Sequence, residues 1–116
     1  MADINAEGTV VNVDMSSEGI RYTVEGSVGK YGRVFFTHQL KPTHSEDSQG
    51  TMTGFARTTT DDGGSVTAPL QGVWRRTGNR YKVYSLDGAS NGDINYVEID
   101  VDLGSKEVSL ALTHVA

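Results

Sequence analysis

The stretch GIRYTVEGSV (residues 19–28) alternates in side-chain character at nearly every position. Ile20 and Tyr22 fall on one face of an extended chain, and Arg21 and Glu25 fall on the other. An α-helix would scatter these residues around its axis, whereas a β-strand gathers them into one apolar and one polar face. The stretch therefore predicts a strand that turns one face toward a core.

The same rhythm extends outward in both directions. We expect strands over residues 8–13, 19–28, 33–40, 50–59, 65–76, 80–86, 94–103 and 106–114. The breaks between them carry Gly, Asn, Asp or Ser, which suit tight turns between neighbouring antiparallel strands. Little or no helix is expected. The fold class is all-β, and residues 1–116 are expected to form one small antiparallel domain.

Eight strands can close into a barrel, which removes exposed edges and leaves an interior for packed side chains or one small ligand. Short, regular connections favour an up-and-down, calycin-like barrel over a two-sheet sandwich, although a sandwich would bury nearly the same residues. The lipocalin and avidin families share the barrel architecture. The lipocalin Gly-x-Trp signature lies on the first strand, whereas Gly72-Val73-Trp74 lies on the fifth expected strand, so no residue roles are carried over.

One connection, residues 41–49, is longer and more polar than the others. In an up-and-down barrel it lies at the same end as the first, fifth and seventh connections. We therefore expect the mouth of the barrel at that end.

Composition excludes several kinds of partner. The net charge is −5 and the basic residues are scattered except for Arg75-Arg76, so no nucleic-acid footprint is present. No apolar run approaches the roughly 18 residues of a membrane helix, and no membrane association is expected. The N-terminal residues do not resemble a secretory signal and cysteine is absent, so a cytoplasmic location is expected. No nucleotide-binding loop or hydrolase elbow occurs, and no cofactor is expected.

His38 occupies the apolar face of its strand, and Tyr22 occupies the corresponding face of the preceding strand. An inward imidazole suits a general base, because its ordinary pKa of about 6.5 is close to working pH. His38 and Tyr22 are therefore the candidate catalytic pair if the register brings them together. The alternative is a hydrogen-bonded core histidine.

Three inward aromatic residues could form the walls of a small-molecule site, with Tyr22 and His38 as its polar anchors. They are Phe36, Trp74 and Tyr81. The small residues Gly54 and Ala56 on the fourth strand could provide space beside them. Ordinary core packing explains the same residues.

Residues 87–98 resemble an EF-hand calcium loop. The candidate oxygen ligands are Asp87, Asn91, Asp93 and Glu98. Ala89 replaces the third ligand, and the flanks alternate like strands where an EF-hand needs helices. A hairpin closed by Asn91-Gly92 explains the loop as well. His38, His44 and His114 are not spaced as ligands of a transition metal, so no metal site is expected.

Phe35, Phe55 and Tyr84 point away from the expected core, and such a cluster can mark an oligomer surface. A homodimer is therefore expected. Three functions remain open. The favoured one is binding of a small, largely apolar molecule inside the barrel. The alternatives are an isomerase or cyclase that uses His38, and a structural or interaction module that acts through the outer aromatic residues.

Overall fold

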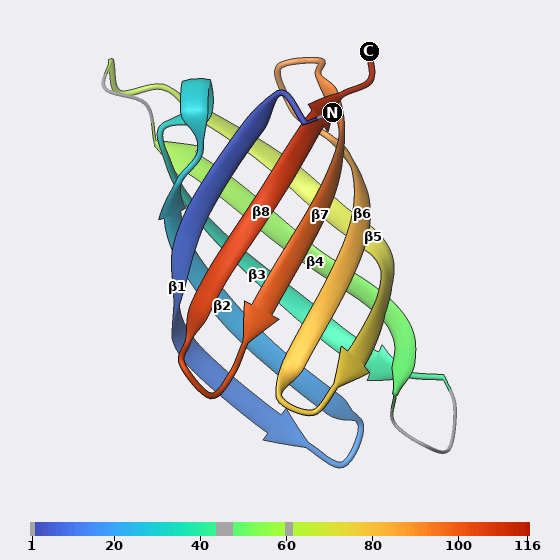
Figure 1. Cartoon of the computed structure of the whole chain (residues 1–116). Helices are drawn as coiled ribbons and strands as arrows, with labels where there is room; N and C mark the ends of the chain where they lie inside the picture. The colour runs from blue at the N-terminus through green and yellow to red at the C-terminus, as the bar shows by residue number, and fades with distance from the viewer. Residues whose placement is uncertain (1, 44–47, 60–61) are drawn as a thin grey trace.

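Eight antiparallel strands follow one another around a closed barrel, and the last strand pairs back with the first (Figure 1). The computed structural model describes residues 2–43, 48–59 and 62–116. The barrel confirms the all-β, up-and-down prediction, and the sandwich alternative is wrong. His44 lies outside the described residues, as does part of the 41–49 connection.

The strands run in chain order around the barrel, with one short 3-10 turn, η1, between the second and third. Their bounds are β1 Ile4–Ser16, β2 Gly19–Ser27, η1 Gly29–Tyr31, β3 Arg33–Pro42, β4 Gln49–Thr59, β5 Ser65–Thr77, β6 Arg80–Gly88, β7 Ile94–Asp102 and β8 Glu107–His114. From β2 to β8 the sequence places every strand end within two residues. For β1 the expected range of 8–13 was too short.

A β-bulge explains the error in β1. The register with β2 shifts between Val10 and Asn12, so the apolar residues on either side of the shift do not follow one alternation. Before the bulge, Ala6 and Gly8 carry little strand preference. The alternating pattern therefore weakens outside residues 8–13, although the strand continues in both directions.

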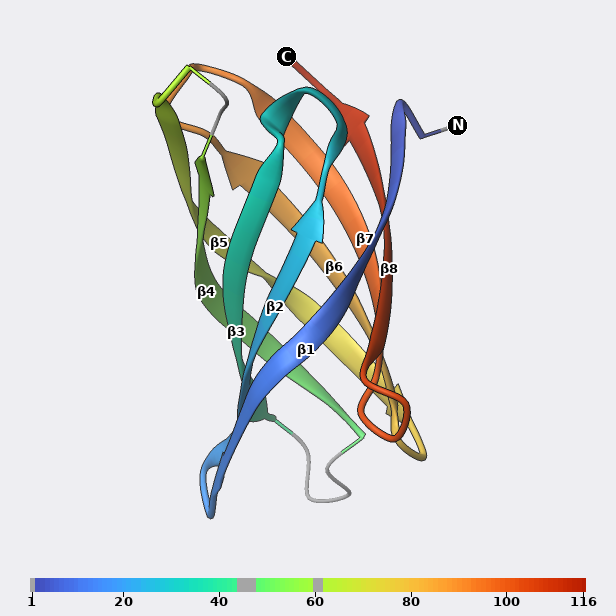
Figure 2. The ribbon, with the colours of Figure 1, turned by 90° about the vertical axis from the view of Figure 1, so that its left-hand side faces the viewer.

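The β1–β2 hairpin projects beyond the barrel (Figure 2). β1 pairs with β8 only from Ile4 to Thr9, whereas its pairing with β2 continues to Ser16. Val13 and Met15 are opposite the core residues Tyr22 and Ile20, yet 38% and 74% of their surfaces are exposed. As cross-strand partners they share the face of Tyr22 and Ile20, but they lie beyond Thr9, where the pairing of β1 with β8 ends.

The interior is densely packed at the end where β1–β2, β3–β4, β5–β6 and β7–β8 connect. Leu40, Met52, Trp74, Val83 and Val101 fill this end, and none of them exceeds 3% exposure. This apolar cluster holds the strands together by removing large side chains from water.

Close strand approach on the wall of the barrel depends on glycine. A Cβ at Gly54 would lie 2.0 Å from the carbonyl oxygen of Thr37 on β3. The small residue at this position thus allows β3 and β4 to bend tightly together. Gly54 thus makes room for the neighbouring strand, whereas Ala56, the other small residue on this face, lines a cavity.

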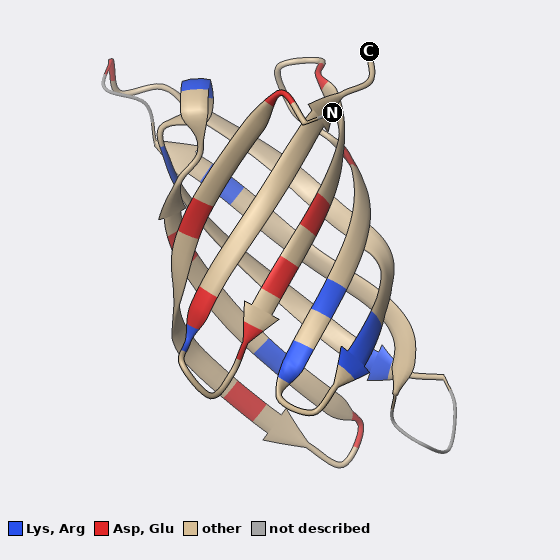
Figure 3. Ribbon diagram, viewed as in Figure 1, with Lys and Arg blue, Asp and Glu red and all other residues tan. Residues whose placement is uncertain are grey.

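Acidic and basic residues are distributed over the strands and connections of the barrel (Figure 3). On β6 and β7, Lys82 pairs with Glu98 at 3.3 Å and with Asp100 at 3.1 Å. Exposed pairs of this kind solubilise a surface and add little stability. Within the described ranges, no helix has the length and apolar character that crossing a membrane requires.

Candidate functional site

A cavity of about 90 Å³, the internal cavity, lies inside the half of the barrel toward η1 and the β6–β7 connection. Its lining is mainly apolar and comes from η1, from the six strands β3 to β8 and from two connecting residues, Val28 and Ala89. The lining residues are Val28, Tyr31, Val34, Phe36, His38, Ala56, Thr58, Val66, Thr67, Ala68, Leu70, Ser85, Asp87, Ala89, Asn95, Val97, Ile99, Leu110 and Leu112. The mouth expected beside residues 41–49 is at the wrong end, because Trp74 and its neighbours pack that end tightly.

Two of the five ligand-binding candidates, Phe36 and His38, line the internal cavity. Tyr22 is not among the lining residues, but its hydroxyl is within hydrogen-bond distance of His38, which is. Trp74 and Tyr81 lie in the packed half, where their ring centres are 5.6 Å apart. The indole Nε1 of Trp74 donates a hydrogen bond of 2.9 Å to the carbonyl oxygen of Thr51. Of the three expected wall residues, Phe36 therefore lines the cavity, whereas Trp74 and Tyr81 belong to the packed half.

Tyr22 and His38 are opposite each other in the β2–β3 register, as the sequence required for a pair. The Tyr22 hydroxyl and the His38 Nδ1 are 2.8 Å apart, and both side chains are buried. Burial lowers the pKa of His38 to about 3 and raises the pKa of Tyr22 above its usual range. At neutral pH the imidazole is uncharged and weakly basic. The pair therefore suits hydrogen bonding better than proton transfer.

A second polar group in the internal cavity was missed by the sequence reasoning. Asp87 and Asn95 are directly opposite each other in the β6–β7 register. Asp87 Oδ1 and Asn95 Oδ1 are both buried, and within the described residues no hydrogen-bond donor reaches either atom. We call these two atoms the acceptor pair. Buried polar atoms are nearly always satisfied, so two neighbouring exceptions are informative.

Burial also changes the charge state of this group. It raises the pKa of Asp87 to about 6, because a carboxylate is poorly solvated inside the barrel. The Ser85 hydroxyl donates a long hydrogen bond of 3.4 Å to Asp87 Oδ2 and offsets this only in part. At neutral pH the acceptor pair therefore carries negative charge.

The side chain of Asn95 is oriented by a chain of hydrogen bonds that ends at the surface. Tyr31 donates its hydroxyl proton to Asp93 Oδ2 at 2.5 Å, and Asn95 Nδ2 donates to the Tyr31 oxygen at 3.0 Å. Asp93 is further held by Lys30 at 3.0 Å. The hydrogen bond from Tyr31 and the contact with Lys30 lower the pKa of Asp93 to about 2. Because Tyr31 has one proton to give, the amide nitrogen of Asn95 must face Tyr31.

Alternation along β6 and β7 contained the missing signal. Val83, Ser85 and Asp87 share the inward face of β6, and Asn95 shares a face with Val97 on β7. The calcium-loop pattern in residues 87–98 concerns only their oxygen ligands and does not indicate that Asp87 and Asn95 both turn inward.

The four calcium candidates do not converge. Asp87 lines the internal cavity, while Asn91 and Asp93 lie in the β6–β7 connection, joined by a hydrogen bond of 3.1 Å. Glu98 lies on the outside of β7 against Lys82. The flanks are strands, so the twelfth position cannot fold back toward the first. Over residues 2–43, 48–59 and 62–116, no three acidic, histidine or cysteine side chains cluster as a metal site.

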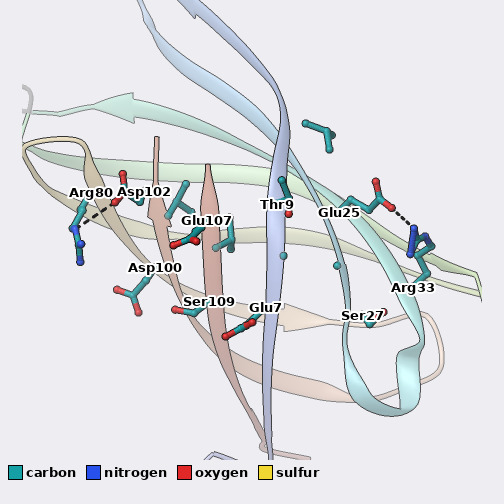
Figure 4. A pocket seen from close by; sticks show the side chains of 15 residues that line it. Glu7, Thr9, Glu25, Ser27, Arg33, Arg80, Asp100, Asp102, Glu107 and Ser109 are labelled. Carbon is teal, nitrogen blue, oxygen red and sulfur yellow. Dashed lines mark ion pairs between the residues drawn. The ribbon is translucent and has the colours of Figure 1, made fainter. Parts of the chain in front are cut away.

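A larger hollow of about 1080 Å³, the outer groove, is lined by residues of β1, β2, β7 and β8, with Arg33 of β3 and Arg80 of β6 also in its lining (Figure 4). Its labelled side chains are mostly charged or hydroxylated, and ion pairs join Glu25 to Arg33 and Asp102 to Arg80. It is an open, polar surface that does not suit a largely apolar molecule.

The outer aromatic residues are exposed as expected. Phe35 on β3 and Phe55 on β4 have 44% and 49% of their surfaces exposed. Phe55 lies two positions from Arg57, the partner of Phe35, so the two rings are diagonal neighbours. Tyr84 on β6 is half-buried between Val73 and Glu98.

Comparisons with protein-family models, curated proteins and solved structures gave no significant match. The function is therefore inferred from the geometry of the chain itself.

Proposed function

We propose that this protein binds a small, largely apolar molecule in the internal cavity. The observation that carries the proposal is the difference between the two halves of one barrel. One half is filled by large side chains, whereas the other retains a cavity of about 90 Å³ with a few polar groups among apolar walls. Small-molecule sites have this character.

The size of the internal cavity limits the ligand. An apolar cavity of about 150 Å³ in another protein takes up benzene, so about 90 Å³ encloses roughly four non-hydrogen atoms. The ligand is therefore short, or only one end of it enters. At about 1.5 kcal/mol per atom, the ceiling for very small ligands, the enclosed part gives a Kd no tighter than about 50 µM.

The chemistry of His38 supports binding over the isomerase or cyclase alternative. A general base works best when its pKa is near the operating pH, and burial moves the pKa of His38 far below that range. Tyr22 is held protonated by the same burial. The pair instead offers a fixed polar contact beside Phe36, whose ring centre is 4.7 Å from that of His38.

Titration with n-butanol, followed by backbone amide NMR of the full chain, tests the proposal. We expect saturable shifts that concentrate on the lining residues of β3, β5 and β8. Ala68→Leu fills the internal cavity and should abolish them, with Ala56→Leu as a second filling variant. Ala111→Leu, on the outside of β8, should bind like the wild type. Absence of saturable shifts in the folded wild-type chain, or unchanged binding in both filling variants, would remove the proposal.

Two further proposals concern the context of binding. The protein acts in the cytoplasm, and it forms a homodimer through the patch around Phe35 and Phe55. The exposure and proximity of these two rings support the dimer. Analytical ultracentrifugation should show a dimer that Phe35→Ser or Phe55→Ser weakens; a wild-type monomer at high concentration excludes it. Cell fractionation tests the location.

A further inference from the structure

The acceptor pair places two hydrogen-bond acceptors side by side in the internal cavity. Asp87 and Asn95 are cross-strand partners, and in such a pair the Cβ atoms are about 5 Å apart. Only 5% of the surface of Asn95 is exposed, yet its Oδ1 has no donor among the described residues. One bound group can therefore reach both oxygens.

The protein has little freedom to satisfy these atoms by itself. Turning the Asn95 amide would place its oxygen against the Tyr31 oxygen, whose proton is already donated to Asp93. On the other side, the Ser85 hydroxyl contacts Asp87 Oδ2 and leaves Oδ1 unpaired. Both oxygens thus stay without a donor among the described residues, on side chains that line the internal cavity.

The negative charge of Asp87 limits which head groups can bind to the acceptor pair. Among the described residues, no lysine or arginine lines the internal cavity, so a carboxylate at Asp87 has no cation from this part of the chain beside it there. An anionic head group would be repelled by Asp87 and would bring no donors. A hydroxyl brings a single donor for two acceptors. A primary ammonium brings a positive charge and three N–H donors, enough for both oxygens.

We propose that the acceptor pair is the head-group subsite of the internal cavity and that it recognises the primary ammonium of a short alkylamine. The inference rests on the proposed function, since the alkyl chain occupies the apolar part of the same cavity. The ammonium donates to Asp87 Oδ1 and Asn95 Oδ1, and three to four carbons lie against Phe36, Ala68 and Leu112.

The test compares n-butylammonium with n-butanol, which has the same chain and a neutral head, by amide and side-chain NMR at pH 7.5 and equal ionic strength. We expect butylammonium to bind at least about tenfold more tightly, because charge-assisted hydrogen bonds are stronger than neutral ones. The Asn95 side-chain amide should shift with the amine. Asp87→Asn should bind the amine no more tightly than butanol, because the charge that favours the ammonium is gone.

Asp100→Asn is the matched control, because it removes the same charge from the outside of β7. It should keep the preference for the amine. Equal binding of the two probes by the wild type would overturn the ammonium subsite and leave the proposed function standing. A preference that survives in Asp87→Asn would also overturn it, since general attraction to a negatively charged protein would then explain the result. Absence of binding by either probe would instead remove the proposed function.

Discussion

At the scale of single residues, the acceptor pair is a source of instability inside an otherwise well-packed barrel. An unpaired buried acceptor costs about 1–3 kcal/mol relative to a satisfied one. Asp87 adds the desolvation of its charge, seen in its raised pKa of about 6. Perturbed titratable groups in cavities are typical of functional sites, where stability is given up for binding.

Replacing Asp87 with Asn should therefore stabilise the protein at high pH. The pKa of Asp87 is about 6 in the folded chain against an ordinary 3.8, so folding favours the protonated form. Its contribution is fully present below about pH 3.8 and is lost as the pH rises through 6. Urea unfolding should show Asp87→Asn about 3 kcal/mol more stable than wild type at pH 8, with little difference near pH 4. A destabilised variant at pH 8 would contradict this account of Asp87.

His38 gives a second prediction, with the opposite dependence on pH. Its folded pKa of about 3 lies below the ordinary 6.5, so the stability that it confers is present above pH 6.5 and is lost as the pH falls toward 3. The NMR signals of the His38 ring should accordingly stay those of a neutral imidazole from pH 8 to pH 5. A titration with a midpoint near 6.5 would show that the ring is reached by water.

At the scale of the elements, the bulge in β1 separates a strand half that closes the barrel from a half that overhangs it. Val10 lies just before the bulge with 3% of its surface exposed, and Val13 lies after it with 38% exposed. Val10→Ala should cost about 2 kcal/mol of unfolding free energy, and Val13→Ala less than about 1 kcal/mol. Equal losses in chemical denaturation would mean that the overhang is as well packed as the barrel.

The bend between β3 and β4 gives a prediction of the same kind. At Gly54 an added Cβ would lie 2.0 Å from the Thr37 carbonyl oxygen, whereas at Gly88 it would meet nothing within 4 Å. Gly54→Ala should therefore cost more than about 2 kcal/mol, while Gly88→Ala should stay within about 0.5 kcal/mol of wild type. Thermal unfolding of the two variants, side by side, measures the difference. A Gly54→Ala variant with the wild-type melting temperature would argue against close backbone approach.

At the scale of the whole molecule, alternation was enough to predict the number and order of the strands and the bounds of β2 to β8, but not the full length of β1. It put Tyr22 and His38 on the inward faces of neighbouring strands but left their register open, and the structure shows that they are cross-strand partners. It could not show which end is hollow. Phe36 and Trp74 both turn inward, and periodicity does not indicate how tightly the side chains around each of them are packed. It also missed the Asp87–Asn95 pair. A hairpin turn or a calcium loop each explains the polar residues in this part of the chain, and neither pattern predicts an inward polar pair.

The central claim is that one end of this barrel is hollow and takes up a small apolar group. The most direct measurement is a crystal structure of the protein under xenon pressure, because xenon enters dry apolar cavities of this size. We expect one ordered xenon atom between Phe36, Ala68 and Leu112, and none beside Trp74. Side chains that close this space, leaving no interior xenon, would contradict the claim.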